Sequence, residues 1–338
     1  MDNGFQNNNG KDSVVGNNTA TILAIAGGKG GTGKSVMSAN LGISLANLGL
    51  RVILIDGDLG GANLHTVLNI KHPKYNLNDF LTNEKTHLKD ILLDTPARTL
   101  KLISGGSELV GIANIQHYKK LKLLRHILQL PADYIIVDLG AGQSYNTLDF
   151  FNLSNEGIII TNPEPTAKLD AYSFIKNVVY RKVLSIFKKD TAVFKLIKQL
   201  LIDERHKSFQ LPRLPMIISQ NYPKEGKMVA SILQSFRPKL IMNKVRRSSQ
   251  IHEGTQLVTL AGEYLGISLK YLGHIENDQK VVDATEIMMP FVLKYPRSRA
   301  SQDLYKIINS LGITDNGSPI KHFYQFKKGM KAQAKEWK

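Results

Sequence analysis

Short apolar runs alternate along most of the chain with longer segments of helical spacing. Short runs rich in Ile, Val, Leu and Ala occupy residues 21–26, 51–55, 100–103, 134–137, 157–161, 239–242 and 269–273. Between the first two runs, apolar residues recur at steps of four and three, the spacing of one helix face: Met37, Leu41, Leu45 and Leu48. Strands that are apolar throughout are covered on both faces. The pattern therefore predicts a doubly wound α/β fold with a mostly parallel sheet.

Three segments depart from this rhythm. Residues 1–19 are rich in Asn and Gly and poor in apolar residues, so we expect a flexible leader before a domain spanning residues 20–312. Within that domain, residues from about 180 to 237 place Lys and Arg between apolar positions of helical spacing, which predicts a basic helical insert. Residues 313–338 contain the turn-forming sequence D-N-G-S-P at 315–319 and continue as a predicted amphipathic tail.

The charge of the chain is unevenly distributed. Residues 176–250 carry a charge of +13 and residues 321–338 carry +5, whereas the other 245 residues sum to −2, which gives the 338 residues a net charge of +16. These two segments are candidate contacts for an anionic polymer or an anionic membrane surface, and a solvated surface is the alternative. The absence of Cys excludes disulfides, thiolate-held zinc, iron–sulfur clusters and a Cys nucleophile. With no run of 18 apolar residues and no secretory signal, a cytoplasmic protein is expected.

Residues 28–35 read G-K-G-G-T-G-K-S, which fits the phosphate-binding pattern G-x-x-x-x-G-K-[ST] between a strand and a helix. The residues expected to surround the phosphates with backbone N–H groups are Gly28, Gly30, Gly31, Thr32 and Gly33. Lys34 would neutralise the terminal phosphate oxygens, and the Ser35 hydroxyl would bind Mg²⁺. The pattern therefore predicts a nucleotide phosphate site.

This loop contains a second lysine, Lys29, five positions before Lys34. The sequence A-G-G-K-G-G-T-G-K-S resembles the deviant Walker A motif of the MinD/ParA ATPase family, and hence a P-loop NTPase fold. The resemblance implies ATP and Mg²⁺ as ligands and a homodimer that forms on ATP binding, with Lys29 of each subunit contacting the phosphates bound by the other. A solvated lysine on a loop is the alternative.

Two of the predicted strands end in carboxylates, which in a parallel sheet point into the ligand crevice. Asp138 follows the run 134–137 in the Walker B arrangement, which holds Mg²⁺ through water. By the resemblance, Asp58 would belong to the first switch of the family and orient the attacking water, and residues 138–142 would form the second switch. Asp56 would support the magnesium shell or serve a purely structural role.

Three residues in the second half of the chain bear on contacts with the base of the nucleotide. Asn243 matches the position where family members place an adenine-reading Asn, and Asn221 is a weaker rival for that role. In the sequence G-H-I-E at 273–276, Glu276 stands where many relatives have Pro.

Three further motifs look most like the FlhG/FleN branch of the family, the flagellar-number and placement ATPases. They are D-L-G-G-A-N-L-H-T at 58–66, D-L-G-A-G at 138–142 and T-N-P-E-P-T at 161–166. The resemblance implies a slow ATPase that a protein partner stimulates and that acts as a hydrolysis-timed spatial switch. Two features depart from that branch: the leader has no Gln-rich activating motif, and the basic insert is large.

Two other functions compete with this one. A ParA-like partition ATPase would bind DNA non-specifically through the basic insert. A metabolic ligase of the same superfamily is disfavoured, because such enzymes generally lack the equivalent of Lys29.

The tail supports the membrane switch. Its apolar residues follow steps of three and four on one helix face, with lysines beside them: Phe323, Phe326, Met330, Ala334 and Trp337. A basic amphipathic helix of this kind is typical of an interfacial anchor, and MinD and FlhG relatives also end in one. We therefore expect ATP-dependent, peripheral association with an anionic membrane surface, and docking of the helix on the protein itself is the alternative.

Overall fold

The structure is a computed structural model. It describes residues 20–58, 61–82, 84, 87–106, 117–154, 156–189, 191–203, 210–315, 318–319 and 323–337. The predicted leader, residues 1–19, lies outside this part of the chain.

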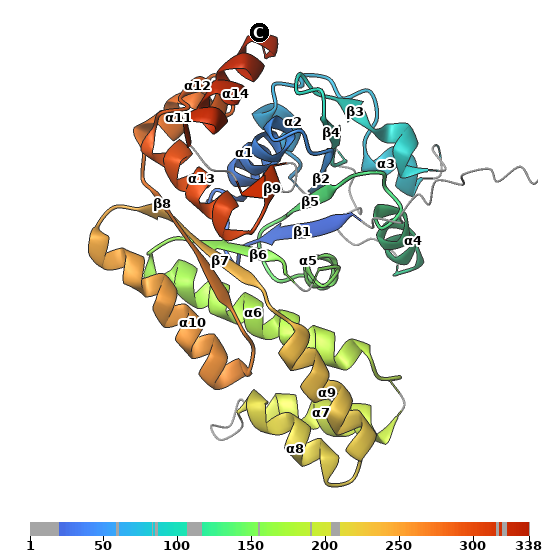
Figure 1. Ribbon diagram of the computed structural model, residues 1–338. Helices are drawn as coiled ribbons and strands as arrows, with labels where there is room; N and C mark the ends of the chain where they lie inside the picture. The colour runs from blue at the N-terminus through green and yellow to red at the C-terminus, as the bar shows by residue number, and fades with distance from the viewer. Residues whose placement is uncertain are drawn as a thin grey trace, which may run out of the picture.

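An eight-stranded sheet crosses the molecule in the order β3-β4-β2-β5-β1-β6-β7-β8 (Figure 1). Its strands are β1 (Thr21–Ala26), β2 (Val52–Gly57), β3 (Leu93–Asp94), β4 (Leu100–Ile103), β5 (Tyr134–Leu139), β6 (Ile158–Thr161), β7 (Lys239–Val245) and β8 (Lys270–Glu276). All neighbours pair in parallel except β3, which pairs antiparallel with β4. Each of the seven predicted apolar runs overlaps one of the parallel strands, so the doubly wound α/β prediction is confirmed.

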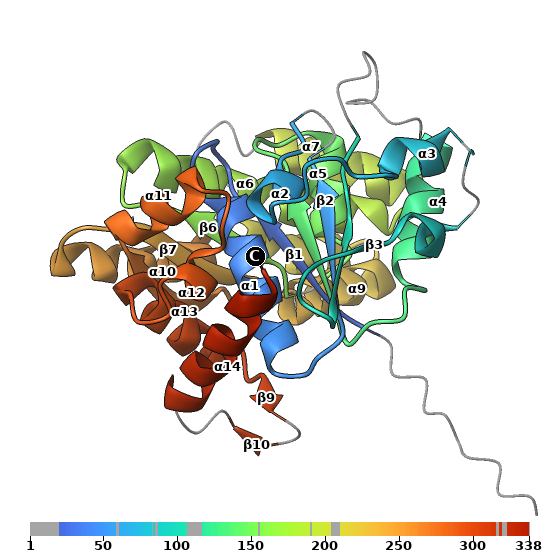
Figure 2. The same cartoon turned by 90° about the horizontal axis from the view of Figure 1, so that it is seen from above.

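Helices cover both faces of this sheet (Figure 2). One face carries α3 (Leu77–Leu81), α4 (His117–Ile127), α5 (Tyr145–Phe151), α6 (Pro165–Ser185) and α10 (Ile251–Leu265). The other carries α1 (Lys34–Asn47), α2 (Leu64–Val67), α11 (Gln279–Glu286), α12 (Phe291–Lys294) and α13 (Arg299–Ser310). Along β1, Ile22 and Ala24 join the first core while Leu23 and Ile25 join the second. Because successive side chains of a strand point to opposite faces, a strand between two helical layers must be apolar throughout.

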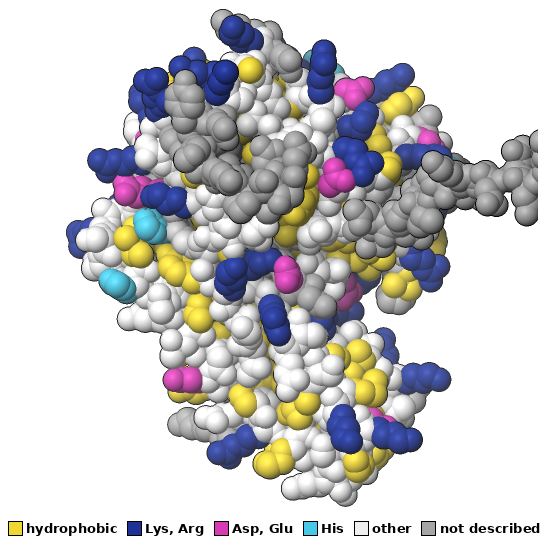
Figure 3. All heavy atoms as spheres, in the orientation of Figure 1, with side chains coloured by type: hydrophobic (Ala, Val, Ile, Leu, Met, Phe, Trp, Pro, Cys, Tyr) yellow, Lys and Arg dark blue, Asp and Glu magenta, His cyan; other side chains and the backbone are white. Residues whose placement is uncertain are grey.

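In its described residues, the long connection between α6 and β7, where the sequence predicts a basic insert, contains three α-helices. They are α7 (Ala192–Asp203), α8 (Leu214–Ser219) and α9 (Pro223–Ser235), which form the lower part of the molecule in Figure 1. The insert is continuous with the first core through buried Ile197, Leu214 and Val229. Figure 3 shows Lys and Arg side chains over both the sheet and the insert on this face, with fewer Asp and Glu between them.

The C-terminal segment packs on the domain. Where the sequence predicts a linker, β9 (Thr314–Asp315) and β10 (Ser318–Pro319) form a small antiparallel pair. The helix α14 (Phe323–Glu336) follows and contacts α1, α12 and α13. Met330 and Trp337 are buried in the second core, at 0% and 5% exposed. The apolar stripe that the sequence predicts for a membrane surface therefore lies, at these two residues, against the protein itself.

The side chains of Phe323 and Phe326 are not among those that the structure describes. No helix in the described part of the chain is both long and apolar enough to cross a membrane.

Candidate functional site

The phosphate-binding loop connects β1 to α1 at the carboxyl edge of the sheet. Its path depends on glycine at two points. A Cβ atom on Gly28 would lie 2.2 Å from the backbone carbonyl of Asp170 in α6, so only glycine lets the loop pass this helix. Gly33 precedes α1 with φ of +92°, in the left-handed region that favours glycine. The loop therefore has the strand–loop–helix setting that the sequence predicts.

Lys34 is the first residue of α1, and its side chain turns inward. The residue is only 8% exposed. Burial lowers the pKa of its ammonium group, and the nearby charges of Asp138 and Asp58 act in the opposite direction. The structure thus brings together one buried cation and two of the predicted carboxylates.

Asp56 and Asp138 lie side by side because β2 and β5 are neighbours in register. Both are almost completely buried, and burial raises the pKa of Asp56 to about 7 and that of Asp138 to about 6. The Ser38 hydroxyl donates a hydrogen bond of 2.7 Å to Asp138 Oδ1, and hydrogen bonds from Ser35 and Ser38 partly offset the effect of burial on Asp138. A buried carboxyl pair of this kind favours an adjacent cation.

Asp56 also fixes the segment that follows β2. Its Oδ1 accepts a hydrogen bond of 3.2 Å from the Asp58 backbone N–H, and its Oδ2 accepts one of 2.9 Å from the Leu64 backbone N–H. Both carboxylate oxygens are thus engaged by the backbone of the predicted first switch. This geometry favours the structural role that the sequence left open for Asp56.

Asp58 lies against the loop of residues 138–142. A Cβ atom on Gly140 would come within 2.8 Å of Asp58 Oδ1, so the two predicted switch segments are in contact. Asp58 is half-buried and close enough to Lys34 to act on its pKa. A carboxylate in this position can accept a proton from, or orient, a water molecule near the phosphate site.

Lys29 points away from this cluster. Its Nζ donates hydrogen bonds to Glu164 Oε2 at 3.4 Å and to Thr166 Oγ1 at 3.1 Å, at the start of α6. The Lys29 side chain is 42% exposed. An exposed ion pair of this kind contributes little stability, so the lysine is readily released.

The end of β7 holds the phosphate-binding loop from the other side. Asn243 Nδ2 donates a hydrogen bond of 2.8 Å to the Thr32 carbonyl, and Lys244 Nζ donates one of 2.8 Å to the Gly31 carbonyl. Lys244 has a φ of +56°, which is unusual for a residue with a side chain. Sequence reasoning missed Lys244, and only its position directly after Asn243 could have pointed to it.

A cavity of about 220 Å³ opens beside Gly33 and Asn243, at the carboxyl ends of β7 and β8. Its walls are mainly apolar, with polar groups from Asn243 and from the loop after β8; the lining includes Met37, Ile275, Asn277, Asp278, Val281 and Phe291. An apolar pocket with a few amide and carboxylate groups suits a planar nitrogen base. Asn243 lies in this pocket, whereas Asn221 follows α8 in the insert and is not part of its lining.

The sequence matches the family described as the CobQ/CobB/MinD/ParA nucleotide binding domain over residues 23–291. The chain belongs to this family. The match covers the phosphate-binding loop, both switch segments, the insert and the base pocket. The family assignment made from the P-loop motif is therefore confirmed.

Among curated relatives, the chain is 27% identical to the antiactivator FleN of Pseudomonas aeruginosa over 282 residues, which span 83% of this chain and 82% of FleN. It is 34% identical to the flagellum site-determining protein YlxH of Helicobacter pylori over 187 residues, spanning 52% of this chain and 60% of YlxH. The likeness to the FlhG/FleN branch is therefore confirmed for this member of the MinD/ParA family.

Among solved structures, the fold is similar to the septum site-determining protein MinD of Pyrococcus horikoshii, which was solved in complex with Mg-ADP. The TM-score is 0.59 at 21% identity, and the alignment covers 86% of this chain and 96% of that one. The MinD of Pyrococcus furiosus gives a TM-score of 0.58 at 22% identity. These likenesses confirm the P-loop NTPase fold.

Proposed function

We propose that the protein is an ATPase that dimerises when it binds ATP with Mg²⁺ and returns to the monomer on hydrolysis. The observation that supports this most strongly is the convergence of Lys34, Asp58 and Asp138 on one glycine loop that carries the extra lysine, Lys29. Within the cluster, Lys34 would neutralise the terminal phosphates and Asp58 would orient the attacking water. We also propose that ATP hydrolysis is slow until a partner protein completes the site.

The residues present fit a magnesium ion. A serine hydroxyl from Ser35 and a buried carboxylate from Asp138 offer the oxygen ligands that Mg²⁺ prefers, and its remaining positions are typically filled by phosphate and water. When bound, Mg²⁺ would neutralise charge on the phosphate oxygens. Burial has raised the pKa of Asp138 to about 6. A neighbouring cation would lower this pKa again and stabilise the carboxylate, so burial of Asp138 favours a cation beside it.

Lys29 is the residue that would couple ATP binding to dimerisation. In the monomer it is held by Glu164 and Thr166 of the same chain, through contacts that cost little to break. We propose that in the dimer it leaves these partners and contacts the phosphates bound by the other subunit. The phosphates would then be the stronger partner, because they concentrate several negative charges in one place.

The proposal is tested with ATP, Mg²⁺ and light scattering. The parent protein should shift from monomer to dimer, and Lys29→Ala should bind ATP with similar affinity yet stay monomeric and hydrolyse no ATP. Lys227→Ala, which removes an exposed lysine of α9 in the insert, is the matched control and should dimerise normally. A Lys29→Ala protein that dimerises and turns over like the parent would refute the role of this lysine.

For the cellular setting, we propose a FleN- or MinD-like role at an anionic membrane surface, reached by release of α14 from the domain. A ParA-like role on DNA is the second candidate, favoured by exposed cations on the insert: Lys195, Lys198, Lys224 and Lys227. Co-sedimentation with anionic liposomes that needs ATP and the segment 320–338 supports the first. ATP-dependent DNA retardation that weakens steeply with salt, without liposome binding, supports the second.

A further inference from the structure

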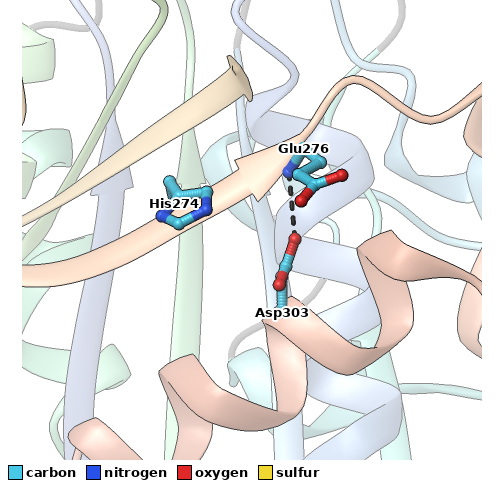
Figure 4. A group of neighbouring side chains, drawn as sticks. All are labelled: His274, Glu276 and Asp303. Carbon is cyan, nitrogen blue, oxygen red and sulfur yellow. Dashed lines mark hydrogen bonds between the residues drawn. The ribbon is translucent and has the colours of Figure 1, made fainter. Parts of the chain in front are cut away.

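A group of three metal-ligating side chains lies at the open edge of the sheet, outside the phosphate site. His274 and Glu276 are two residues apart on the edge strand β8, and Asp303 comes from α13, which packs against this strand. Figure 4 shows the three residues, with Asp303 rising from the helix toward the strand. One ligand atom from each lies within 4.8 Å of the other two. Residues two apart on a strand share a face, which explains why β8 supplies two of the three.

We propose that His274, Glu276 and Asp303 form a binding site for a divalent transition metal of the zinc class. One imidazole nitrogen and two carboxylate oxygens are ligands that Zn²⁺ accepts, and three protein ligands leave a position for water. The mixed nitrogen and oxygen set disfavours Mg²⁺ and Ca²⁺, which prefer oxygen ligands alone. The proposal does not rest on the ATPase function, although Glu276 also lines the cavity beside Gly33 and Asn243.

The geometry requires a modest contraction. A metal that lies about 2.1 Å from each ligand needs ligand atoms roughly 3–3.5 Å apart, so ligand atoms at the 4.8 Å limit must approach one another by roughly 1.3–1.8 Å. His274 and Glu276 are only partly buried and can rotate, whereas Asp303 is 4% exposed and fixed. One anchored ligand and two adjustable ligands can close on an ion without moving the backbone.

Asp303 is oriented as metal ligands commonly are. Its Oδ2 accepts a hydrogen bond of 3.1 Å from the Glu276 backbone N–H, the contact drawn as a dashed line in Figure 4. Hydrogen bonds of this type fix the direction of a ligating carboxylate, and the remaining lone pairs on its oxygens stay available to a metal. The same bond ties the end of β8 to α13, so a metal here would join two elements that already touch.

The cations near the triad are replaceable. Arg299 pairs with Glu276 at 3.0 Å and Lys306 pairs with Asp303 at 2.9 Å, yet the side chains of Arg299 and Lys306 are 79% and 70% exposed. Because both cations are mostly in solvent, a divalent ion that binds the carboxylates can displace them. In the described part of the chain, the ring nitrogens of His274 have no hydrogen-bond partner, which leaves the imidazole free to bind.

The site is tested by calorimetric titration with Zn²⁺ on the full chain, without nucleotide and without a polyhistidine tag. We expect one Zn²⁺ to bind per chain, with affinity reduced at least about 10-fold by His274→Ala and by the isosteric Asp303→Asn. His252→Ala, which removes an exposed histidine of α10, is the matched control and should bind Zn²⁺ like the parent. Histidine NMR on ¹⁵N-labelled protein should show the shift of one imidazole, absent in His274→Ala.

The Mg²⁺ site is distinguished by Ser35→Ala, which removes a predicted ligand at the phosphate loop and should leave Zn²⁺ binding intact. Thermal unfolding supplies a readout that does not depend on titration heats, because Zn²⁺ should raise the melting temperature of the parent and of Ser35→Ala but not of His274→Ala. Parent-like Zn²⁺ affinity in His274→Ala would overturn the proposal. So would loss of Zn²⁺ binding in Ser35→Ala, which would assign the metal to the phosphate loop.

Discussion

Replacing Gly329 by leucine should release α14 from the domain. A Cβ atom on Gly329 would lie 2.3 Å from Asn47 Oδ1 at the end of α1, and rotating the Asn47 amide could make room for a methyl group but not for an isobutyl group. The substitution does not change the identity of Met330 or Trp337, and it makes helix formation in this segment more favourable by about 1 kcal/mol. It therefore separates docking of the helix from formation of the helix.

The size of the effect follows from the buried side chains. Burial of an apolar side chain as large as Met330 contributes roughly 1.5–3 kcal/mol, and Trp337 contributes at least as much. If Gly329→Leu removes about 3 kcal/mol of docking free energy, the undocked fraction rises roughly 100-fold. The same apolar residues cannot contact the domain and a bilayer together. Binding to anionic liposomes should therefore become strong without ATP.

Trp337 is the only tryptophan of the chain, so its fluorescence reports docking directly. Gly329→Leu should shift the emission to the red in buffer and back to the blue with liposomes. Ala332→Leu is the matched control, because it adds the same side chain at an exposed position of α14. A red-shifted Gly329→Leu protein that sediments with liposomes no better than Ala332→Leu would refute the membrane role of the tail.

Four further outcomes are expected. Lys34→Ala should abolish ATP binding in calorimetry, because a buried ammonium group facing the phosphates is lost. Asp58→Ala should bind ATP with parent-like affinity but release phosphate much more slowly in a single-turnover assay. Because the pKa of Asp56 is raised to about 7, the folded state binds its proton more tightly than the unfolded state; stability in urea should fall from about pH 4 to pH 7, and Asp56→Asn should flatten this slope. Glu164→Gln should strengthen ATP-dependent dimerisation up to about fivefold in light scattering, since it removes an exposed ion pair that holds Lys29.

The parts of the fold that local patterns encode could be predicted from the sequence. The central strands β1, β2, β5 and β6 are largely apolar because helices cover both of their faces, and this pattern can be read locally. The glycine and lysine spacing of the phosphate-binding loop is also a local motif. β3 has only two residues, so no periodicity marks it. The docking of α14 could not be predicted, because an apolar helix face has the same spacing whether it contacts a bilayer or the distant α1.

The candidate site was predicted residue by residue but not as an arrangement. Asp56 and Asp138 are far apart in sequence, and only the neighbouring positions of β2 and β5 make them a buried pair with raised pKa values. The contact of Lys244 with Gly31 likewise depends on strand order, since β7 reaches the loop across β6. No pattern of neighbouring residues in the sequence marks either the Asp56–Asp138 pair or the contact between Lys244 and Gly31.

The two halves of the phosphate-binding loop differ in how firmly the rest of the chain holds them, and this difference fits a lysine that changes partners on dimerisation. The half that leads into α1 is fixed from β7, because Asn243 and Lys244 hold the carbonyls of Thr32 and Gly31. A loop that is already ordered loses less entropy when it binds a ligand. The Lys29 side chain, by contrast, is held by exposed contacts with Glu164 and Thr166 at the start of α6. Nucleotide binding within one chain benefits from the ordered backbone at Gly31 and Thr32. Exchange of partners by Lys29 on dimerisation benefits from a side chain that is weakly held. Strengthening the hold on Lys29 should therefore impair dimerisation, whereas weakening the Lys244 contact should impair nucleotide binding in the monomer.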